Sequence, residues 1–383
     1  MPINKVAIVG TTAKSLLHFR AGLIRVLVAR GIRVEVLAMD WCPLTRYEAD
    51  LLGAVPVCWG SGKRSGLNLF SEFYAWAGLV WFFRQSRPDA VLCFFLKPIV
   101  MTAWAAFVAG VPRCVGLLEG LGYFFTQRPR PAGFKVRIIR RFLLLLLRWS
   151  LPRLSHLVVL NQDDAAELQS RWHLRLPQVT RLGGIGVDLK HFMQMPVVTQ
   201  PFCAIFVARL LAEKGVQEWV AAARKVKQIH PDVRFLMLGE LDALNPGGLT
   251  QQQLDCLLTD KVVDYLGFKA DVRPWLAECS VFVLPSYREG LPMSTQEAMA
   301  VGRAVITTDV PGCRDTVVDQ VNGFVVPPFN SEALAERLLE LINNPCLVVT
   351  MGEASRRFAE LHFDADQQCL RLAQLVSGDE SFI

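Results

Sequence analysis

A buried strand that runs directly into a helix is the most restrictive feature of this sequence. Residues 281–284 are four apolar residues bounded by turn formers, a pattern typical of a strand inside a parallel sheet. A polar turn follows, and Pro292 stands where the first helical residue belongs, because a backbone N–H has no intrahelical partner there. The helix should end at Gly302, since glycine readily adopts the left-handed conformation that ends helices. The segment predicts a parallel α/β sheet with a strand–helix junction at the carboxyl ends of its strands.

The same alternation of strand and helix recurs along the chain. Apolar strands are expected at 6–9, 34–38 and 203–207, with helices at 16–30 and 70–84 among them. Such alternation produces right-handed crossovers and doubly wound sheets, whose ligands bind at the carboxyl ends of the strands. Because 383 residues exceed one ordinary core, we expect two domains.

Composition excludes several classes of protein. Apolar residues make up 52% of the chain and charged residues 20%, so the chain should fold. A net charge of +6 without any nucleic-acid-binding motif argues against a nucleic-acid partner. The ten cysteines form no C-x-x-C pair, which favours reduced thiols in the core of a cytosolic protein. The sequence starts with a strand instead of a signal peptide and has no apolar run long enough to span a membrane, so a location in the cytosol or on the inner face of the membrane is expected.

Two acidic residues flank the predicted junction. Glu289 should lie in the loop after the strand, and Glu297 just over one turn inside the helix. The backbone of Gly290 and Leu291 should lie at the positive end of that helix, where N–H groups can bind an anion. Either acid alone is more often a solvated side chain. Together with the helix end, they predict a site for a ligand that carries hydroxyls and phosphate.

A second charged pair follows another predicted strand. Arg209 ends that strand, and Lys214 lies at the start of the next helix. Arginine can bind two phosphate oxygens at once and lysine supplies a compact charge, so the pair could hold a diphosphate.

The motif E-G-x-P-x-x-x-x-E at 289–297, after V-L-P-S, and the motif R-x-x-x-x-K-G at 209–215 resemble the signatures of family 4 glycosyltransferases. That family has the GT-B fold, in which two Rossmann-like doubly wound domains face each other across a cleft. The resemblance implies a site whose parts are all in the second half of the chain. In it Glu289 contacts the donor sugar, Gly290 and Leu291 meet the diphosphate, and Glu297 binds the ribose. Arg209 and Lys214 neutralise the leaving diphosphate, and Gly267 and Phe268 hold the base. Gly239, at the ligand edge of a further strand, is added to the donor site.

A further acid, Glu119, follows an apolar strand in the sequence E-G-L-G-Y. A buried carboxylate without a partner is costly, so Glu119 implies either solvent or a ligand. This loop, and P-G-C-R-D at 311–315, resemble a bacterial subgroup of the family that extends sugars on polyprenyl diphosphate. The resemblance implies that Glu119 contacts the acceptor or the donor sugar.

Polar residues after the first strand are candidates for binding the acceptor. The first turn has one glycine and no G-x-G-x-x-G, which argues against a nicotinamide dehydrogenase. Thr12, Lys14, Ser15 and His18 could bind a phosphate or another anionic group, and Arg20 could point the same way. The alternative is that these residues cap the helix or belong to its packed face.

The glycine-rich sequence at 183–186 is the best candidate for a linker. We therefore expect an acceptor-binding domain at 1–185, a nucleotide-sugar-binding domain at 186–365 and a C-terminal helix at 366–383 that crosses back to the first domain. Asp364 and Asp366 match a metal-binding D-x-D, but they do not follow a buried strand, and a helix cap is favoured. No metal and no cofactor are expected.

Residues 137–153 combine five arginines and a tryptophan with a continuous apolar block. Two interpretations are open: a helix at a membrane surface, and a buried helix with arginines at its ends.

Taken together, the resemblance to the family implies a retaining, metal-independent glycosyltransferase. The predicted donor is a UDP-sugar, such as UDP-N-acetylgalactosamine or UDP-N-acetylglucosamine, and the predicted acceptor is a saccharide on undecaprenyl diphosphate at the inner membrane surface. Two alternatives remain: a UDP-sugar 2-epimerase of the same fold, and a non-catalytic protein that binds sugar nucleotides.

Overall fold

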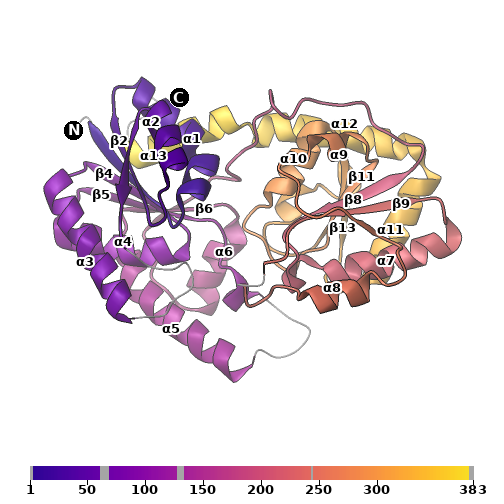
Figure 1. Ribbon diagram of the computed structural model, residues 1–383, viewed down its shortest axis with the longest axis horizontal. Coiled ribbons are helices and arrows are strands. Elements are labelled where there is room, and N and C mark those ends of the chain that lie inside the picture. The colour runs from indigo at the N-terminus through magenta and orange to yellow at the C-terminus, as the bar shows by residue number, and fades with distance from the viewer. Residues whose placement is uncertain (1–2, 61–68, 127–132, 243–244, 379–383) are drawn as a thin grey trace. The chain divides into compact units, whose positions relative to one another are not determined.

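The computed structural model describes residues 3–60, 69–126, 133–242 and 245–378 (Figure 1). These residues form two compact units. Unit 1 contains the chain up to Leu121, Phe134–Ile185 and the chain from Ala365 onward. Unit 2 contains Gly186–Asp364 and the described part of Gly122–Gly133. The sequence did not predict that a short segment after residue 121 groups with unit 2.

Unit 1 is built on a seven-stranded parallel sheet with the strand order β3-β2-β1-β4-β5-β6-β7. Its strands are β1 (Lys5–Val9), β2 (Arg33–Ala38), β3 (Ala54–Cys58), β4 (Ala90–Phe94), β5 (Arg113–Leu118), β6 (His156–Val159) and β7 (Gln178–Arg181). Its helices are α1 (Ala13–Ala29), α2 (Pro43–Leu51), α3 (Leu69–Ser86), α4 (Leu96–Ala109), α5 (Phe134–Ser150), α6 (Gln162–Ala166) and α13 (Ala365–Ser377).

Unit 2 is built on a six-stranded parallel sheet with the order β10-β9-β8-β11-β12-β13. Its strands are β8 (Cys203–Val207), β9 (Arg234–Leu238), β10 (Asp264–Tyr265), β11 (Val281–Leu284), β12 (Ala304–Thr308) and β13 (Gly323–Val326). Its helices are α7 (Val216–Ile229), α8 (Gln251–Leu257), α9 (Arg273–Ala277), α10 (Met293–Val301), α11 (Ser331–Asn343) and α12 (Pro345–His362). The prediction of two Rossmann-like α/β sheets is confirmed.

The strand order of each sheet reverses at one point. In unit 1 the reversal lies between β1 and β4, and in unit 2 it lies between β8 and β11. The loops that leave the two strands at such a point diverge, and ligands of doubly wound sheets bind in the crevice that they leave. In unit 2 these are the loops that carry Arg209, Lys214 and Glu289. The topology of unit 2 alone therefore brings the predicted residues to one edge.

The ends of two predicted helices differ from expectation. Pro292 is the residue before α10 and has an extended conformation (φ −68°, ψ 124°), so the helix begins at Met293. The missing N–H of proline costs nothing at this capping position either. The helix expected at 366–383 is α13, which ends at Ser377. It packs against α1 of unit 1, and Arg113 donates a hydrogen bond of 2.9 Å to the carbonyl oxygen of Leu375.

No helix within the described ranges is long and apolar enough to cross a membrane. The ten cysteines, all of which lie in described ranges, are free thiols. Cys42, Cys58, Cys256 and Cys346 are exposed, so the expectation that the thiols lie in the core is wrong for these four.

Candidate functional site

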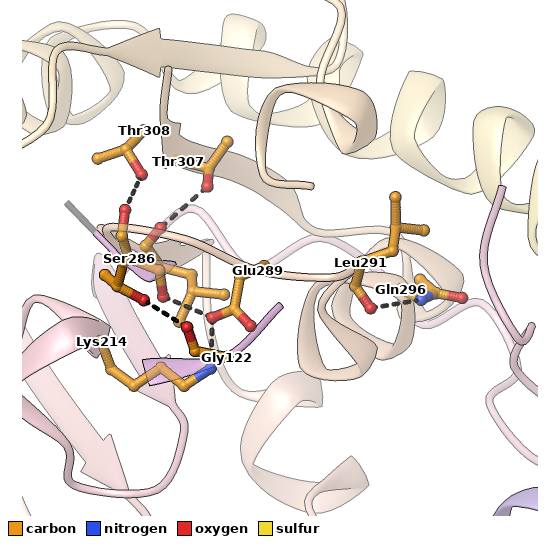
Figure 2. A network of polar contacts seen from close by, with 10 residues as sticks. Gly122, Lys214, Ser286, Glu289, Leu291, Gln296, Thr307 and Thr308 are labelled. Carbon is orange, nitrogen blue, oxygen red and sulfur yellow. Dashed lines mark hydrogen bonds and ion pairs between the residues drawn. The ribbon is translucent and has the colours of Figure 1, made fainter. Parts of the chain in front are cut away.

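Lys214 and Glu289 form an ion pair at the point where the strand order of unit 2 reverses. Lys214 ends the short helical turn after β8, and Glu289 lies in the loop after β11. The distance from Lys214 Nζ to Glu289 Oε1 is 2.5 Å, and both side chains are largely buried. The same carboxylate oxygen accepts a hydrogen bond of 2.7 Å from the hydroxyl of Ser286 (Figure 2). A cation, a carboxylate and a hydroxyl thus converge at the carboxyl edge of the sheet.

Hydrogen bonds from the neighbouring strand fix the loop that carries Glu289. Thr307 donates to the carbonyl oxygen of Leu284 at 2.9 Å, and Thr308 donates to that of Ser286 (Figure 2). Both threonines lie at the end of β12 and are buried. Because they hold the carbonyl groups at the start of the loop, the side chains of Ser286 and Glu289 leave the sheet from a fixed backbone.

The loops after β8 and β11 are also bound directly to each other. The backbone N–H of Tyr287 donates to the carbonyl oxygen of Glu213 at 2.8 Å. The hydroxyl of Tyr287 donates to Glu218 at 2.7 Å, and burial, together with this bond, raises the pKa of Tyr287. These contacts tie the position of Lys214 to the loop that carries its partner.

Gly215 makes this close approach possible. Its φ is +74°, and a Cβ atom at this position would lie 2.1 Å from the carbonyl oxygen of Pro285. A side chain here would push the two loops apart and would also strain the backbone.

Glu297 lies on the fifth residue of α10, as predicted. It is partly buried, and this burial raises the pKa of its carboxyl to about 7. Gln296 beside it donates to the carbonyl oxygen of Leu291 at 3.4 Å (Figure 2). It also donates to that of Pro292 at 3.4 Å. The start of α10 therefore offers a carboxyl group whose charge changes near neutral pH.

Arg209 lies close to the loop after β9. Its Nη1 is 2.9 Å from Asp242 Oδ2, and nearly half of the Arg209 side chain is exposed. The N–H of Gly239 donates to the carbonyl oxygen of Gly267 at 3.0 Å, which joins two of the predicted donor-binding residues. Phe268 beside them is exposed. Asp242 was not predicted, because a single acid after a strand carries no distinctive pattern.

Thr12 and Ser15 cap α1 of unit 1. The Thr12 side chain accepts from the Ser15 N–H at 3.4 Å and donates to the Ser15 hydroxyl at 2.7 Å. The N–H of Ala13 donates to Asp40 at 2.6 Å, so a second side chain also occupies this helix end. The structure thus shows the capping role for these residues, the alternative open at the sequence level.

Lys14 and His18 are exposed, one turn apart on α1. Burial of part of the ring, and then the charge of Lys14, lower the pKa of His18. Both remain available at the carboxyl edge of the unit 1 sheet.

Arg20 and Glu119 form an ion pair inside unit 1. The side chain of Arg20 is 1% exposed and that of Glu119 is 9% exposed. The Arg20 guanidinium also lies over the ring of Phe94, at 4.6 Å, and its Nη1 donates to the carbonyl oxygen of Phe19 at 3.0 Å. The suggestion that Arg20 points to an acceptor is therefore wrong. The inference that Glu119 must meet solvent or a ligand omitted the third possibility, which the structure shows: a cation from the first helix.

Comparison with known proteins gives two family matches, one to each half of the chain. Residues 21–188 match the model described as Glycosyltransferase Family 4, and residues 190–358 match the model described as Glycosyl transferases group 1. Together these matches cover most of the chain.

Two relatives match this chain over nearly the whole length of both sequences. One is the N,N'-diacetylbacillosaminyl-diphospho-undecaprenol alpha-1,3-N-acetylgalactosaminyltransferase of Campylobacter jejuni, which is 26% identical over 94% of this chain and 96% of its own. The other is the capsular polysaccharide biosynthesis glycosyltransferase CapM of Staphylococcus aureus, 23% identical over 93% of this chain and 92% of its own.

Solved structures share the fold. Sucrose-phosphate synthase from Thermosynechococcus elongatus superposes with a TM-score of 0.77 at 18% identity, covering 97% of this chain and 98% of that one. Anabaena HepE in complex with UDP superposes with a TM-score of 0.75 at 18% identity, covering 98% and 100%. At these identities the likeness establishes the fold, and the chemistry has to be argued from the site.

Proposed function

Because this chain belongs to the family 4 glycosyltransferases of GT-B fold, we propose that it transfers an N-acetylhexosamine from a UDP-sugar to a saccharide on undecaprenyl diphosphate. N-Acetylgalactosamine and N-acetylglucosamine are the proposed sugars. The product would be an intermediate in the assembly of a bacterial surface polysaccharide or of a glycoprotein glycan. The similar proteins of Campylobacter and Staphylococcus support the proposal through their names alone.

The observation that carries the proposal is the fixed pair of Lys214 and Glu289 at the strand-order reversal of unit 2. In the proposed complex the donor diphosphate competes with Glu289 for the lysine cation. Glu289 would then turn to the hydroxyls of the donor sugar while its carboxylate keeps the hydrogen bond from Ser286. Arg209 supplies the second cation after leaving Asp242. The ion pairs of the free protein thus hold both cations in place before the donor binds.

The proposed reaction retains the configuration of the donor sugar and uses neither a metal nor a cofactor. The bond between the anomeric carbon and the diphosphate oxygen breaks, and a bond to an acceptor hydroxyl oxygen forms on the same face. The hydroxyl proton passes to the leaving phosphate oxygen. Lys214 and Arg209 would stabilise the negative charge that develops there, which is the kind of preorganised electrostatic effect that dominates many enzymes.

The carboxyl edge of unit 1 is the proposed place for the acceptor. Lys14 and His18 are exposed at the start of α1 and could meet an acceptor phosphate. Thr12 and Ser15 would contribute only if their capping hydrogen bonds are exchanged. A lipid-linked acceptor would bring the reaction to the inner surface of a membrane.

The direct test incubates the purified protein with UDP-N-acetylgalactosamine, UDP-N-acetylglucosamine or UDP-glucose and a short-chain polyprenyl-diphosphate saccharide. We expect the acceptor to gain the mass of one N-acetylhexosamine, with an α-linkage by NMR and undiminished turnover in EDTA. An epimer formed without acceptor would indicate the 2-epimerase. UDP binding without any product would indicate a non-catalytic protein, and either result would reject the proposal.

Donor binding should depend on pH through Glu297. Burial raises the pKa of this carboxyl to about 7, so the folded protein holds a proton between pH 4.5 and 7 that the unfolded chain has lost. The free protein is therefore destabilised progressively as the pH rises from about 4.5 to 7, whereas the carboxylate that would accept hydrogen bonds from ribose forms mainly above 7. We expect affinity for UDP to fall as the pH is lowered from 8 to 6.

The variant Glu297→Gln separates the two effects. It should raise the melting temperature at pH 8 by a few degrees and lower UDP affinity at that pH about tenfold, with a smaller pH dependence between 6 and 8 than the wild type shows. Calorimetry at three pH values measures both quantities. Glu360→Gln, an exposed acid of α12, is the control and should change neither. Equal pH dependence in the wild type and Glu297→Gln would exclude Glu297 as the titrating group.

A further inference from the structure

The outer face of α5 carries an exposed apolar stripe. Its members recur every three or four residues, and at about 100° per residue they fall within an arc of about 80°. They are Phe134, Ile138, Phe142, Leu145 and Trp149, with exposed fractions from 45% to 70%. A row of large apolar side chains on one face of a helix is normally buried, so this stripe calls for a partner.

Cations border the stripe on both sides. On the same helical projection Lys135 lies along one border, and Arg137, Arg141 and Arg148 lie along the other. All four are exposed. The sequence has no acidic residue between Glu119 and Asp163, so no carboxylate of this segment offsets their charge.

The opposite face of α5 packs on unit 1. Leu147 and Ser150 are buried, and the helix contacts α4. The Ser150 hydroxyl hydrogen-bonds to the carbonyl oxygens of Leu146, at 2.8 Å, and of Val100, at 3.3 Å. Arg140 lies over the ring of Trp172 at 5.2 Å. The interpretation of 137–153 as a fully buried helix is therefore wrong: one face is anchored and the other is presented to solvent.

A second stripe lies on α3, which also packs on α4 of the same unit (Figure 1). Phe70, Phe73, Tyr74 and Trp81 are all more than 60% exposed. At about 100° per residue they share an arc of about 100°. Two helices that both contact α4 thus expose rows of large side chains that include aromatic residues. Trp, Tyr and Phe are the aromatic residues that insert at a membrane interface.

We infer that the exposed stripe of α5 with its flanking cations, together with the aromatic row of α3, docks on a bilayer that contains anionic lipid. The apolar side chains would enter the boundary between headgroups and acyl chains, while the four cations meet lipid phosphates. A second copy of the chain fits poorly, because a symmetric contact would bring these cations against their equivalents with no acid between them. The inference rests on the proposed function in one respect: a lipid-linked acceptor would lie in the same membrane. Binding of this surface to a bilayer needs neither donor nor acceptor.

The test measures binding of the full chain to vesicles without donor or acceptor. Vesicles of phosphatidylcholine alone are compared with vesicles that also contain phosphatidylglycerol, in a flotation assay. We expect the wild type to float with the anionic vesicles at least about tenfold more strongly and to detach as salt is raised, because headgroup attraction is screened. No binding by the wild type to anionic vesicles would overturn the inference.

Paired variants separate the apolar and the charged parts. Phe142→Ser with Trp149→Ser, and separately Arg141→Gln with Arg148→Gln, should each lower anionic-vesicle binding by about tenfold or more. Matched controls remove exposed residues elsewhere, and they should bind like the wild type. The controls are Ile229→Ser with Leu361→Ser, and Arg46→Gln with Arg357→Gln.

The remaining outcomes are decisive as well. Unchanged vesicle binding in both α5 variants, with melting temperatures like the wild type, would contradict the inference. So would a dimer in light scattering that Phe142→Ser with Trp149→Ser converts to a monomer, because it would assign the stripe to a second copy. If vesicle binding behaves as expected but no sugar is transferred, the proposed function fails and the docking surface stands.

Discussion

Replacing Lys214 by alanine should lower the rate of sugar transfer by about 100-fold or more, because it removes a preorganised cation from the site where diphosphate charge develops. Lys214 is largely buried and lies 2.5 Å from Glu289, so its cation is already held at the site before the donor binds. The substitution should act mainly on kcat and to a smaller degree on UDP affinity, since the charge grows as the bond breaks. Steady-state kinetics with the best donor of the panel measures both.

Lys225 provides the matched control. It also forms an ion pair in unit 2, with Glu332, but away from the strand-order reversal. Lys225→Ala should leave kcat and KM within about twofold of the wild type, because exposed ion pairs contribute little. A Lys214→Ala protein that folds and retains full activity would rule out the proposed role of the lysine in charge neutralisation.

Replacing Arg20 by methionine should lower the free energy of unfolding of unit 1 by about 3–5 kcal/mol, because it leaves the buried carboxylate of Glu119 without its cation. Methionine preserves much of the apolar volume over Phe94, so the loss reports on charge more than on packing. Urea denaturation, followed by a signal from unit 1, measures the change.

The double variant Arg20→Met with Glu119→Leu tests the cause. Removing both charges should recover most of the lost stability, since apolar replacement of a buried ion pair is often neutral or stabilising. Its activity then separates two roles of Glu119. A stable but inactive double variant supports contact with a sugar, whereas a stable and active one assigns Glu119 to structure alone. Wild-type stability of Arg20→Met would contradict the proposed importance of the pair.

Much of unit 2 could be predicted from the sequence because its signals are local. The strand 281–284, the turn and the helix up to Gly302 follow one another without interruption, and the structure has β11, the loop and α10 there. Arg209 and Glu289 each follow a strand, so the rule for doubly wound sheets places them at one edge once the strand order is known.

The contacts that hold the predicted residues could not be predicted in the same way. Arg20 and Glu119 are far apart in the chain, and neither has a pattern that marks the other as its partner. The hydroxyl of Ser286 donates to a carboxylate, and that of Thr308 donates to a backbone carbonyl oxygen. Small hydroxyl residues make such bonds in many settings, so the sequence does not mark these two. The exposed stripe of α5 was ambiguous in the sequence, because six consecutive apolar residues fit burial and a surface equally well until the packed face is known.

The position of α13 bears on how the protein is made. This helix belongs to unit 1, where it covers α1 and places Cys369 against Gly22, yet it follows the whole of unit 2 in the chain. Unit 2 is complete at Asp364, before unit 1 has its final helix. During synthesis, the face of α1 that α13 covers therefore stays uncovered until unit 2 has been made, and apolar surface exposed in this way favours aggregation.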